Sequence, residues 1–292
     1  MIKIYIPLSI ITVLLKISGA LDIMAPFLSP FMEMMGLPGE TAITLVAAGT
    51  NGIYGGIATL AAFDLTFRQI TILGVVLGFS HNLIVETGIL MKLKFARIQI
   101  AIFRFLFAIL TGIILNLVLP DTIQGTIINP YAKLSEDIWI STTKSILATC
   151  GQIVGLILIL NISYNFAKQW KYSSYLKQRL KFIPNAVGLS ENAFVPWIAG
   201  SIFGIVYGAG ILFRFVENNE LSRKDASLIT IFLCLCHAII EDSLLFWVIG
   251  GNFWYIFIIR TGLAVVFIKI LSYNNLYNKI AWIGLIREKN AV

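Results

Sequence analysis

Eight polar or ionisable residues lie inside long apolar stretches of the sequence, and their types could bind a solute or carry a proton. They are His81, Asn82, Glu86 and Arg104 in the first half of the chain, and His237, Glu241, Asp242 and Arg260 in the second. An ionisable side chain at the centre of a bilayer costs at least about 2.5–3.5 kcal/mol. Such residues should face one another or water, and we predict that these eight form a substrate-binding or coupling site.

Helical geometry sorts these residues by the face that each would occupy. Asn82 and Glu86 are four residues apart and would share one face of a helix, and so would His237 and Glu241. His81 and Glu86 are five apart, which turns them about 140° away from each other on an unbroken helix. We therefore expect His81 and Glu86 not to pair.

A stretch with an intramembrane arginine follows each histidine stretch. The predicted ion pairs are Glu86 with Arg104, and Asp242 with Arg260. Such a set could bind an anionic or polar solute through its arginines. It could also couple transport to protons through histidine and carboxylate groups. The alternative is a structural lattice of ion pairs that only orients the two halves.

The sequence gives little support for metal binding, disulfide formation or catalysis. Two histidines from separate halves could bind a divalent ion with carboxylates, but no close ligand spacing supports this, so no metal and no cofactor is predicted. Cys150, Cys234 and Cys236 all lie in apolar segments and are predicted to be buried, inert thiols. No nucleophile elbow, phosphate-binding glycine loop or zincin helix occurs, and Ser80 would point away from its neighbour His81. We predict that the protein is not an enzyme.

The composition is that of an integral membrane protein. The 292 residues are 58% hydrophobic and only 13% charged, and the mean hydropathy is +0.86. Soluble chains carry nearer a quarter of charged residues. The net charge of +7 does not indicate nucleic acid binding, because the basic residues gather at the ends of apolar segments. The expected partners are the lipid bilayer and an unidentified small molecule or ion, and a homo-oligomer stays open.

The apolar segments that follow one another along the chain are expected to be helical. They are Ile2–Ala20, Thr41–Phe63, Thr66–Leu90, Ile98–Pro120, Lys144–Phe166, Asn192–Phe213, Ala226–Ile249 and Phe253–Leu271. We expect Thr66–Leu90 to be one long helix. The Met- and Pro-rich stretch Asp22–Glu40 is expected to be a half-buried or an interfacial segment.

The two halves of the chain match at an offset of 156 residues, which predicts an internal duplication. The offset places Gly52 on Gly208, Asp64 on Glu220, Arg68 on Lys224, His81 on His237, Glu86 on Asp242 and Arg104 on Arg260. His81 and His237 are the only histidines. We predict one repeat over residues 1–120, a polar extracytoplasmic linker over 121–142, and a second repeat over 143–292.

Two glycine-broken segments decide the topology. Their glycines are Gly49, Gly52, Gly55 and Gly56 in the first, and Gly204, Gly208 and Gly210 in the second. If every apolar segment spans the membrane, eight spans form two parallel repeats, and the basic clusters at 92–97 and 168–181 lie outside. If the two segments are re-entrant hairpins, six spans form two inverted repeats and both clusters lie inside, as the positive-inside rule requires. We predict the second fold, although glycine in tight helix packing would be the alternative.

The turn Gly36-Leu37-Pro38-Gly39-Glu40, which leads into the first glycine-broken segment, resembles the Gate or nucleoside recognition domain. A weaker copy, Gly188-Leu189-Ser190-Glu191, precedes Gly204–Gly210. That domain occurs in concentrative nucleoside transporters, in the membrane part of ferrous iron transport protein B and in spore maturation membrane proteins. The resemblance implies a helical inner-membrane protein with two Gate-like units, but no substrate and no nucleoside-binding residue.

These observations predict a multi-pass secondary transporter or permease of the inner (cytoplasmic) membrane. It would move a small polar or anionic solute through a site at the interface of the repeats. One alternative is a non-transporting membrane scaffold that assembles partners. The other is a translocator of lipid phosphates.

Overall fold

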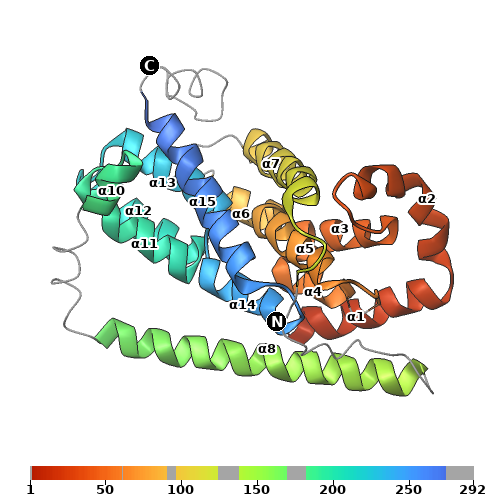
Figure 1. Cartoon of the computed structure of the whole chain (residues 1–292). Helices are drawn as coiled ribbons and strands as arrows, with labels where there is room; N and C mark the ends of the chain where they lie inside the picture. Colours follow the sequence, from red (N-terminus) through yellow and green to blue (C-terminus); the bar gives the residue numbers. More distant parts are fainter. Residues whose placement is uncertain (1, 61, 91–96, 124–137, 170–181, 274–292) are drawn as a thin grey trace. The chain divides into compact units, whose positions relative to one another are not determined.

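The computed structural model describes residues 2–60, 62–90, 97–123, 138–169 and 182–273 (Figure 1). Within these ranges every regular element is helical and none is a strand, so the expected all-α integral membrane protein is confirmed. Basic clusters 92–97 and 168–181 and the linker 121–142 fall largely outside the described residues.

Four stretches in the described part of the chain are long and apolar enough to cross a membrane. They are Phe67–Gly88, Ile98–Val118, Arg223–Val248 and Phe253–Ser272. A fifth would be α1 (Ile2–Ile17) with α2 (Ala20–Glu33), which meet at a 91° bend. Helix α8 (Ile138–Gln169) covers the expected span Lys144–Phe166, and its Ile146–Leu160 part is a shorter apolar helix. The total of six spans stays a prediction.

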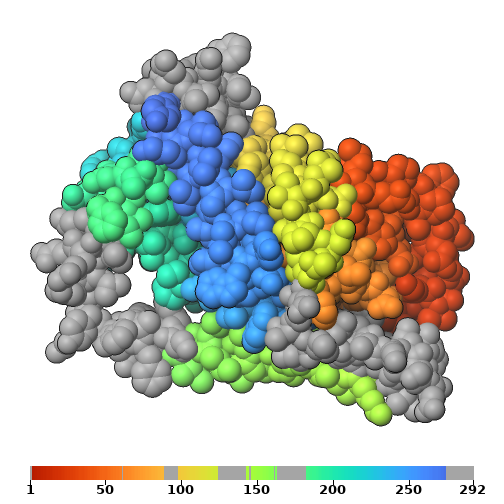
Figure 2. Space-filling model, viewed as in Figure 1, coloured from red at the N-terminus to blue at the C-terminus, as the bar shows by residue number. Residues whose placement is uncertain are grey.

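Long helices of this kind should present apolar side chains to lipid. Helix α15 (Phe253–Ser272) lies open on the face shown in Figure 2, where it is blue. Its exposed side chains include Trp254, Ile258 and Val266. An apolar surface of this kind suits the hydrocarbon core of a bilayer, because the side chains that it exposes there contact lipid and not water.

The contacts of the chain divide it into two compact units. Unit 1 comprises Met1–Leu83, Phe105–Asn161 and Glu241–Phe257, and unit 2 comprises Ile84–Arg104, Ile162–Ile240 and Ile258–Val292. The segments correspond to each other at roughly the predicted offset. The cuts after residues 83 and 104 in the first half have counterparts after 240 and 257 in the second, 157 and 153 residues later. Each unit therefore takes segments from both of the predicted repeats.

In unit 1 the first glycine-broken segment is a helical hairpin. Helix α3 (Ala42–Asn51) ends at Gly52, whose φ of 78° and ψ of −176° lie in a region that is essentially restricted to glycine, and α4 (Ile53–Leu60) follows. The two arms pack side by side in opposite directions, as the hydrogen bond between the Thr59 and Thr44 hydroxyls at 2.8 Å shows. Arms of 10 and 8 residues reach about 15 and 12 Å, well short of the bilayer core.

The second glycine-broken segment, in unit 2, has the same form. Helix α11 (Phe194–Phe203) ends at Gly204, with φ 89° and ψ 169°, before α12 (Ile205–Glu217) begins. A Cβ on Gly208 would collide with Gly200 Cα, so these two glycines set how closely the arms approach. Neither glycine-broken segment is a single straight helix, which is the form that the re-entrant prediction expects, and the number of crossings stays a prediction.

The predicted hairpin glycines serve different purposes. Gly52 and Gly204 form the turns, while Gly55, Gly56 and Gly208 allow the arms to touch. Gly49 has only ordinary van der Waals contacts around its Cβ position, and Gly210 has open space there. The turns also correct the alignment, since Gly52 matches Gly204 at an offset of 152, not Gly208 at 156. The offset of 156 applies from the helix caps Thr66 and Ser222 onward, because α12 is longer than α4.

The stretch Thr66–Leu90 is not one helix, and that expectation was wrong. Helix α5 (Phe67–Ser80) ends at His81, Asn82 has a left-handed φ of 51°, and α6 (Leu83–Leu90) follows. The second histidine stretch breaks in the same way between α13 (Arg223–Leu235) and α14 (Ile239–Val248), where Ala238 has φ 46°. Polar residues stand at both breaks, His81 with Asn82 and His237 before Ala238, but on sequence alone we interpret them as site residues within continuous helices.

In each unit a cationic side chain near the start of one long helix caps the C-terminal end of another. In unit 1, Arg68 near the start of α5 donates to the carbonyl of Asn116 at 2.6 Å, in the last turn of α7 (Arg97–Val118). In unit 2, Lys224 near the start of α13 donates to the carbonyl of Ser272, also at 2.6 Å, at the end of α15. Both donors and both acceptors are 156 residues apart. A cation on the last carbonyls of a helix satisfies groups that the helix leaves without partners.

The remaining expectations fall in the N-terminal part and at the cysteines. Helix α1 accounts for most of Ile2–Ala20, whereas Asp22–Glu40 contains α2, the glycine turn and the 3-10 helix η1 (Gly39–Thr41). Its counterpart before the second hairpin comprises α10 (Phe182–Val187) and η3 (Glu191–Ala193). The three cysteines are buried and form no disulfide.

Candidate functional site

The break in each histidine span abuts the turn of a hairpin. In unit 1 the Asn82 backbone N–H donates to the Ala48 carbonyl at 2.7 Å, and a Cβ on Gly52 would lie 3.8 Å from Asn82 Cγ. In unit 2 a Cβ on Gly204 would lie 3.8 Å from Ala238 Cβ. Each unit thus brings two interruptions of helical backbone together, which frees polar backbone groups that lipid could not satisfy.

The two histidines occupy the ends of the first half-helices. His81 Nδ1 lies 2.9 Å from the Leu77 carbonyl oxygen, and His237 Nδ1 lies 2.6 Å from the Leu233 carbonyl oxygen. A carbonyl oxygen can only accept, so each Nδ1 must carry a hydrogen. The two rings are therefore fixed in the same way by their own helices, with Nε2 left to face a second partner.

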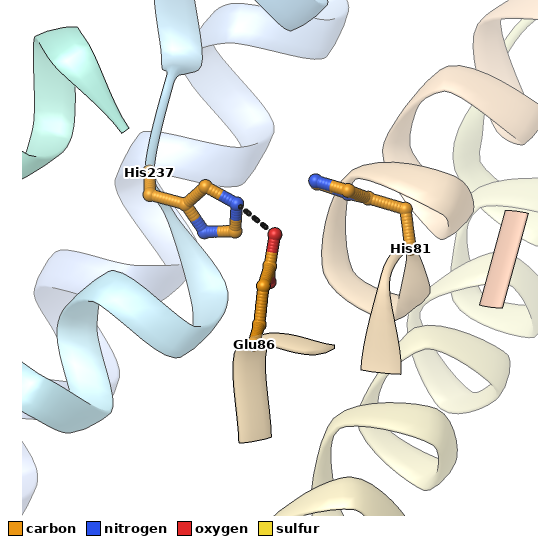
Figure 3. A group of neighbouring side chains, drawn as sticks. All are labelled: His81, Glu86 and His237. Atoms are coloured by element: carbon orange, nitrogen blue, oxygen red, sulfur yellow. Dashed lines mark ion pairs between the residues drawn. The ribbon is translucent and has the colours of Figure 1, made fainter. Parts of the chain in front are cut away.

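The carboxyl group of Glu86 contacts two basic side chains in unit 2. Glu86 Oε2 lies 2.9 Å from Arg104 Nη1, and Oε1 lies 3.0 Å from His237 Nε2. The side chains of Arg104, His237 and Glu86 are 0%, 3% and 4% exposed. Figure 3 shows the Glu86 carboxylate and the His237 ring directed at each other. The predicted ion pair of Glu86 with Arg104 is present.

This geometry places one proton between the histidine and the glutamate. His237 Nδ1 already carries a hydrogen that it donates to Leu233, so Nε2 can approach a carboxyl oxygen in two ways. Either the ring is an imidazolium facing a carboxylate, or a neutral ring accepts from a protonated Glu86. The Arg104 guanidinium contacts the other carboxyl oxygen, and in both arrangements one proton lies between the histidine and the glutamate.

A second arginine completes this cluster. Arg260 on α15 is fully buried, and its Nη2 donates to the His237 backbone carbonyl at 3.4 Å. The break after α13 exposes that carbonyl, because the residues that follow do not continue the helix. Four of the eight predicted residues, Glu86, Arg104, His237 and Arg260, are thus brought together in unit 2.

The other four predicted residues belong to unit 1. His81 and Asn82 lie at the break after α5, and Glu241 and Asp242 lie in the first turn of α14. Asp242 is buried, at 2% exposure. Its predicted pairing with Arg260 joins residues of different units and stays a prediction. The shared-face argument for Asn82 with Glu86, and for His237 with Glu241, fails because a helix break separates each pair.

One residue of unit 1 was not predicted. The Tyr54 hydroxyl, on α4, donates to Glu241 Oε1 at 2.6 Å. Tyr54 is two positions after the turn glycine Gly52, and this was the only signal that could have pointed to it. A short O–H···O contact to a carboxylate is among the stronger hydrogen bonds in proteins.

Comparison with known proteins supports the membrane assignment. No family model matches the chain, and no solved structure does. The chain is 28% identical over 278 residues to an uncharacterized membrane protein, YvoD, of Bacillus subtilis (strain 168), with 93% of this chain and 89% of the relative covered. The chain is therefore a multi-pass membrane protein by similarity and by structure. The resemblance to the Gate domain remains a prediction from short motifs.

Proposed function

We propose that the protein is a secondary transporter of the inner membrane, which moves a small polar or anionic solute together with a proton. The observation that carries this proposal is the buried Glu86 carboxylate, held between Arg104 at 2.9 Å and His237 at 3.0 Å. Ionisable groups at this depth are costly and mark ion and substrate paths in membrane proteins.

The backbone supports the same function. Transporters commonly bind substrate where membrane helices are discontinuous, because the broken ends present unsatisfied polar groups near the bilayer midplane. Here two apolar spans break at Asn82 and Ala238, and each break contacts a hairpin turn at a glycine.

The chemistry of the cluster suits exchange of one anion for another. A carboxylate or phosphate on a solute could replace Glu86 as the partner of the Arg104 guanidinium, which binds planar anions in a bidentate manner. Glu86, no longer paired with Arg104, would then take up one proton from water, in addition to the proton that lies between it and His237. When the solute leaves, Glu86 returns to Arg104 as a carboxylate and releases the proton that it took up. The solute and the proton would thus move in the same direction.

A ligand screen on the purified protein tests the proposal. Inorganic phosphate, short dicarboxylates, nucleosides and divalent chlorides would each be added while the melting temperature in detergent is recorded. A solute at about 100 times its Kd stabilises the folded state by about 2.7 kcal/mol. Short-chain lipid phosphates form a separate arm, which distinguishes a headgroup from a free anion.

Single-residue variants test whether a solute stabilises the protein by binding at the Glu86–Arg104 pair. Arg104→Gln should remove the stabilisation by the solute, and it should abolish uptake into proteoliposomes driven by a pH gradient. Arg214→Gln is the matched control, since Arg214 is an exposed arginine of α12 in the same unit. An Arg104→Gln protein that folds and still takes up the solute would rule out the site. No ligand for the native protein, with loss of expression in Arg104→Gln, would favour the scaffold instead.

A further inference from the structure

Helix α2 of unit 1 exposes a row of large apolar side chains. Their exposed fractions run from 40% at Phe31 to 84% at Phe27. Successive residues of a helix are about 100° apart, so the whole row falls within about 100° of the circumference of α2. We call this row the α2 stripe, and it consists of Ile23, Met24, Phe27, Phe31 and the capping residue Met34.

The rest of α2 is buried on one side and acidic on the other. Leu21 and Met32 are buried, at 2% and 0% exposure. Asp22 and Glu33 are exposed, and each lies about 140° from the centre of the α2 stripe by helical pitch. The sequence Ala20–Glu33 contains no lysine or arginine. Helix α2 is therefore amphipathic, with a polar face that carries only negative charge.

The C-terminal end of α2 lies level with the end of an apolar span. The side-chain amide of Asn116, in the last turn of α7, donates to the carbonyl of Met34 at 3.2 Å. The apolar span of α7 ends at Val118. Just beyond it, Arg68 pairs at 3.3 Å with Asp121, whose side chain is 95% exposed. Charged groups at the end of a span mark the level at which the hydrocarbon gives way to water, and α2 ends at this level.

The bend between α1 and α2 sets the direction of α2. The two helices meet at 91°, after a left-handed Gly19 with φ 74° (Figure 1). Helix α1 exposes Ile10, Leu14 and Ile17, as a helix in contact with acyl chains does. A helix that turns by a right angle from a membrane helix runs along the surface of the bilayer.

We propose that α2 is an interfacial helix, which lies flat in the membrane surface with the α2 stripe among the acyl chains. Asp22 and Glu33 then face the headgroups and water. Lipid is the occupant of the stripe, because α2 ends at the boundary of the α7 span. At the same level Leu117 and Val118 of α7 are 80% and 71% exposed. This inference is independent of the proposed transport.

The charge of α2 also indicates which lipid surface it fits. Interfacial helices that select anionic lipid carry lysine or arginine on their polar face. Helix α2 carries only Asp22 and Glu33 there. A surface of zwitterionic lipid should therefore suffice for its insertion, with no gain from anionic headgroups.

A fluorophore on single cysteines of the full chain tests the orientation of α2. Phe27→Cys or Glu33→Cys is introduced into a protein whose native cysteines are serine, labelled with bimane and reconstituted in phosphatidylcholine vesicles. One quencher is a lipid with a nitroxide on its acyl chain, and the other is iodide in water. We expect the lipid nitroxide to quench position 27 several-fold more strongly than position 33, and iodide to show the opposite order. Position 33 is the matched control, because it is exposed on the same helix.

Met24→Cys provides a second position in the α2 stripe and should behave like Phe27→Cys if that protein does not fold. Equal quenching of positions 27 and 33 by iodide would place the stripe in water and overturn the proposal. Protection of position 27 from both quenchers would overturn it too, since a second copy or another segment of the chain would then cover the stripe. Added phosphatidylglycerol should leave the quenching by lipid unchanged, and a marked increase would refute the preference inferred from the acidic face.

Discussion

Asn82 and Ala238 stand 156 residues apart and share a left-handed backbone, with φ of 51° and 46°. The histidine immediately before each of them bonds a carbonyl four residues earlier in its own helix. Asparagine tolerates this conformation, whereas for alanine it costs about 1–2 kcal/mol. The conformation thus recurs at the same point of the predicted repeat even where the residue type opposes it. This recurrence is what the predicted internal duplication would produce.

Substitution at these two breaks should have opposite effects. We expect Ala238→Asn to raise stability by about 0.5–1 kcal/mol, because asparagine relieves the backbone strain. Asn82→Ala should lower stability by a similar amount. The melting temperature in detergent measures both. As a control, Ala226→Asn in the regular part of α13 should be destabilising. An Ala238→Asn protein that melts well below the native protein would contradict the strained backbone.

The two hairpin turns should not tolerate a side chain. Gly52 and Gly204 combine φ near 80–90° with an extended ψ, a region that costs other residues about 1–3 kcal/mol. Gly52→Ala and Gly204→Ala should each lower the melting temperature. Gly210→Ala is the control, because its Cβ position is open and alanine favours a helix interior. If Gly210→Ala lowered the melting temperature while Gly52→Ala left it unchanged, the assignment of Gly52 as the turn residue would be wrong.

The sequence predicts the parts of this fold that depend on composition and spacing. The apolar segments, the hairpin glycines and the pairing of Glu86 with Arg104 follow from hydropathy and from the cost of buried charge. The breaks at Asn82 and Ala238 do not, because the polar residues beside them also fit a binding site on a continuous helix, and alanine gives no signal for a left-handed backbone. The alignment at Gly52 failed because a constant offset cannot register the different lengths of α4 and α12. Tyr54 could be recognised only once α4 and α14 were placed.

Charge removal at the buried cluster should be strongly non-additive. Arg104→Gln leaves the Glu86 carboxylate without its guanidinium partner, and breaking a buried ion pair costs about 3–5 kcal/mol. Glu86→Gln should be costly in the same way, because it leaves buried cations uncompensated. The double variant should lose less than the sum of the two, by about 0.5–3 kcal/mol. Thermal unfolding of the four proteins provides the cycle, and Arg214→Gln again serves as control. Strict additivity would mean that Glu86 and Arg104 do not interact.

The predicted inverted arrangement of the repeats has a consequence for sidedness. The basic clusters at 92–97 and 168–181 lie outside the described residues. If the segments Thr41–Phe63 and Asn192–Phe213 re-enter instead of crossing, both clusters would lie on the cytoplasmic side, as the distribution of lysine and arginine favours. Single cysteines at Lys92 and Lys177, in a protein with its native cysteines replaced, should react with an impermeant maleimide only after the cells are opened. A cysteine at Lys133, in the polar linker, is the control and should react in intact cells. Labelling of position 92 or 177 in intact cells would instead support the topology of eight spans with parallel repeats. The proposed transport by inverted repeats would then lose its basis.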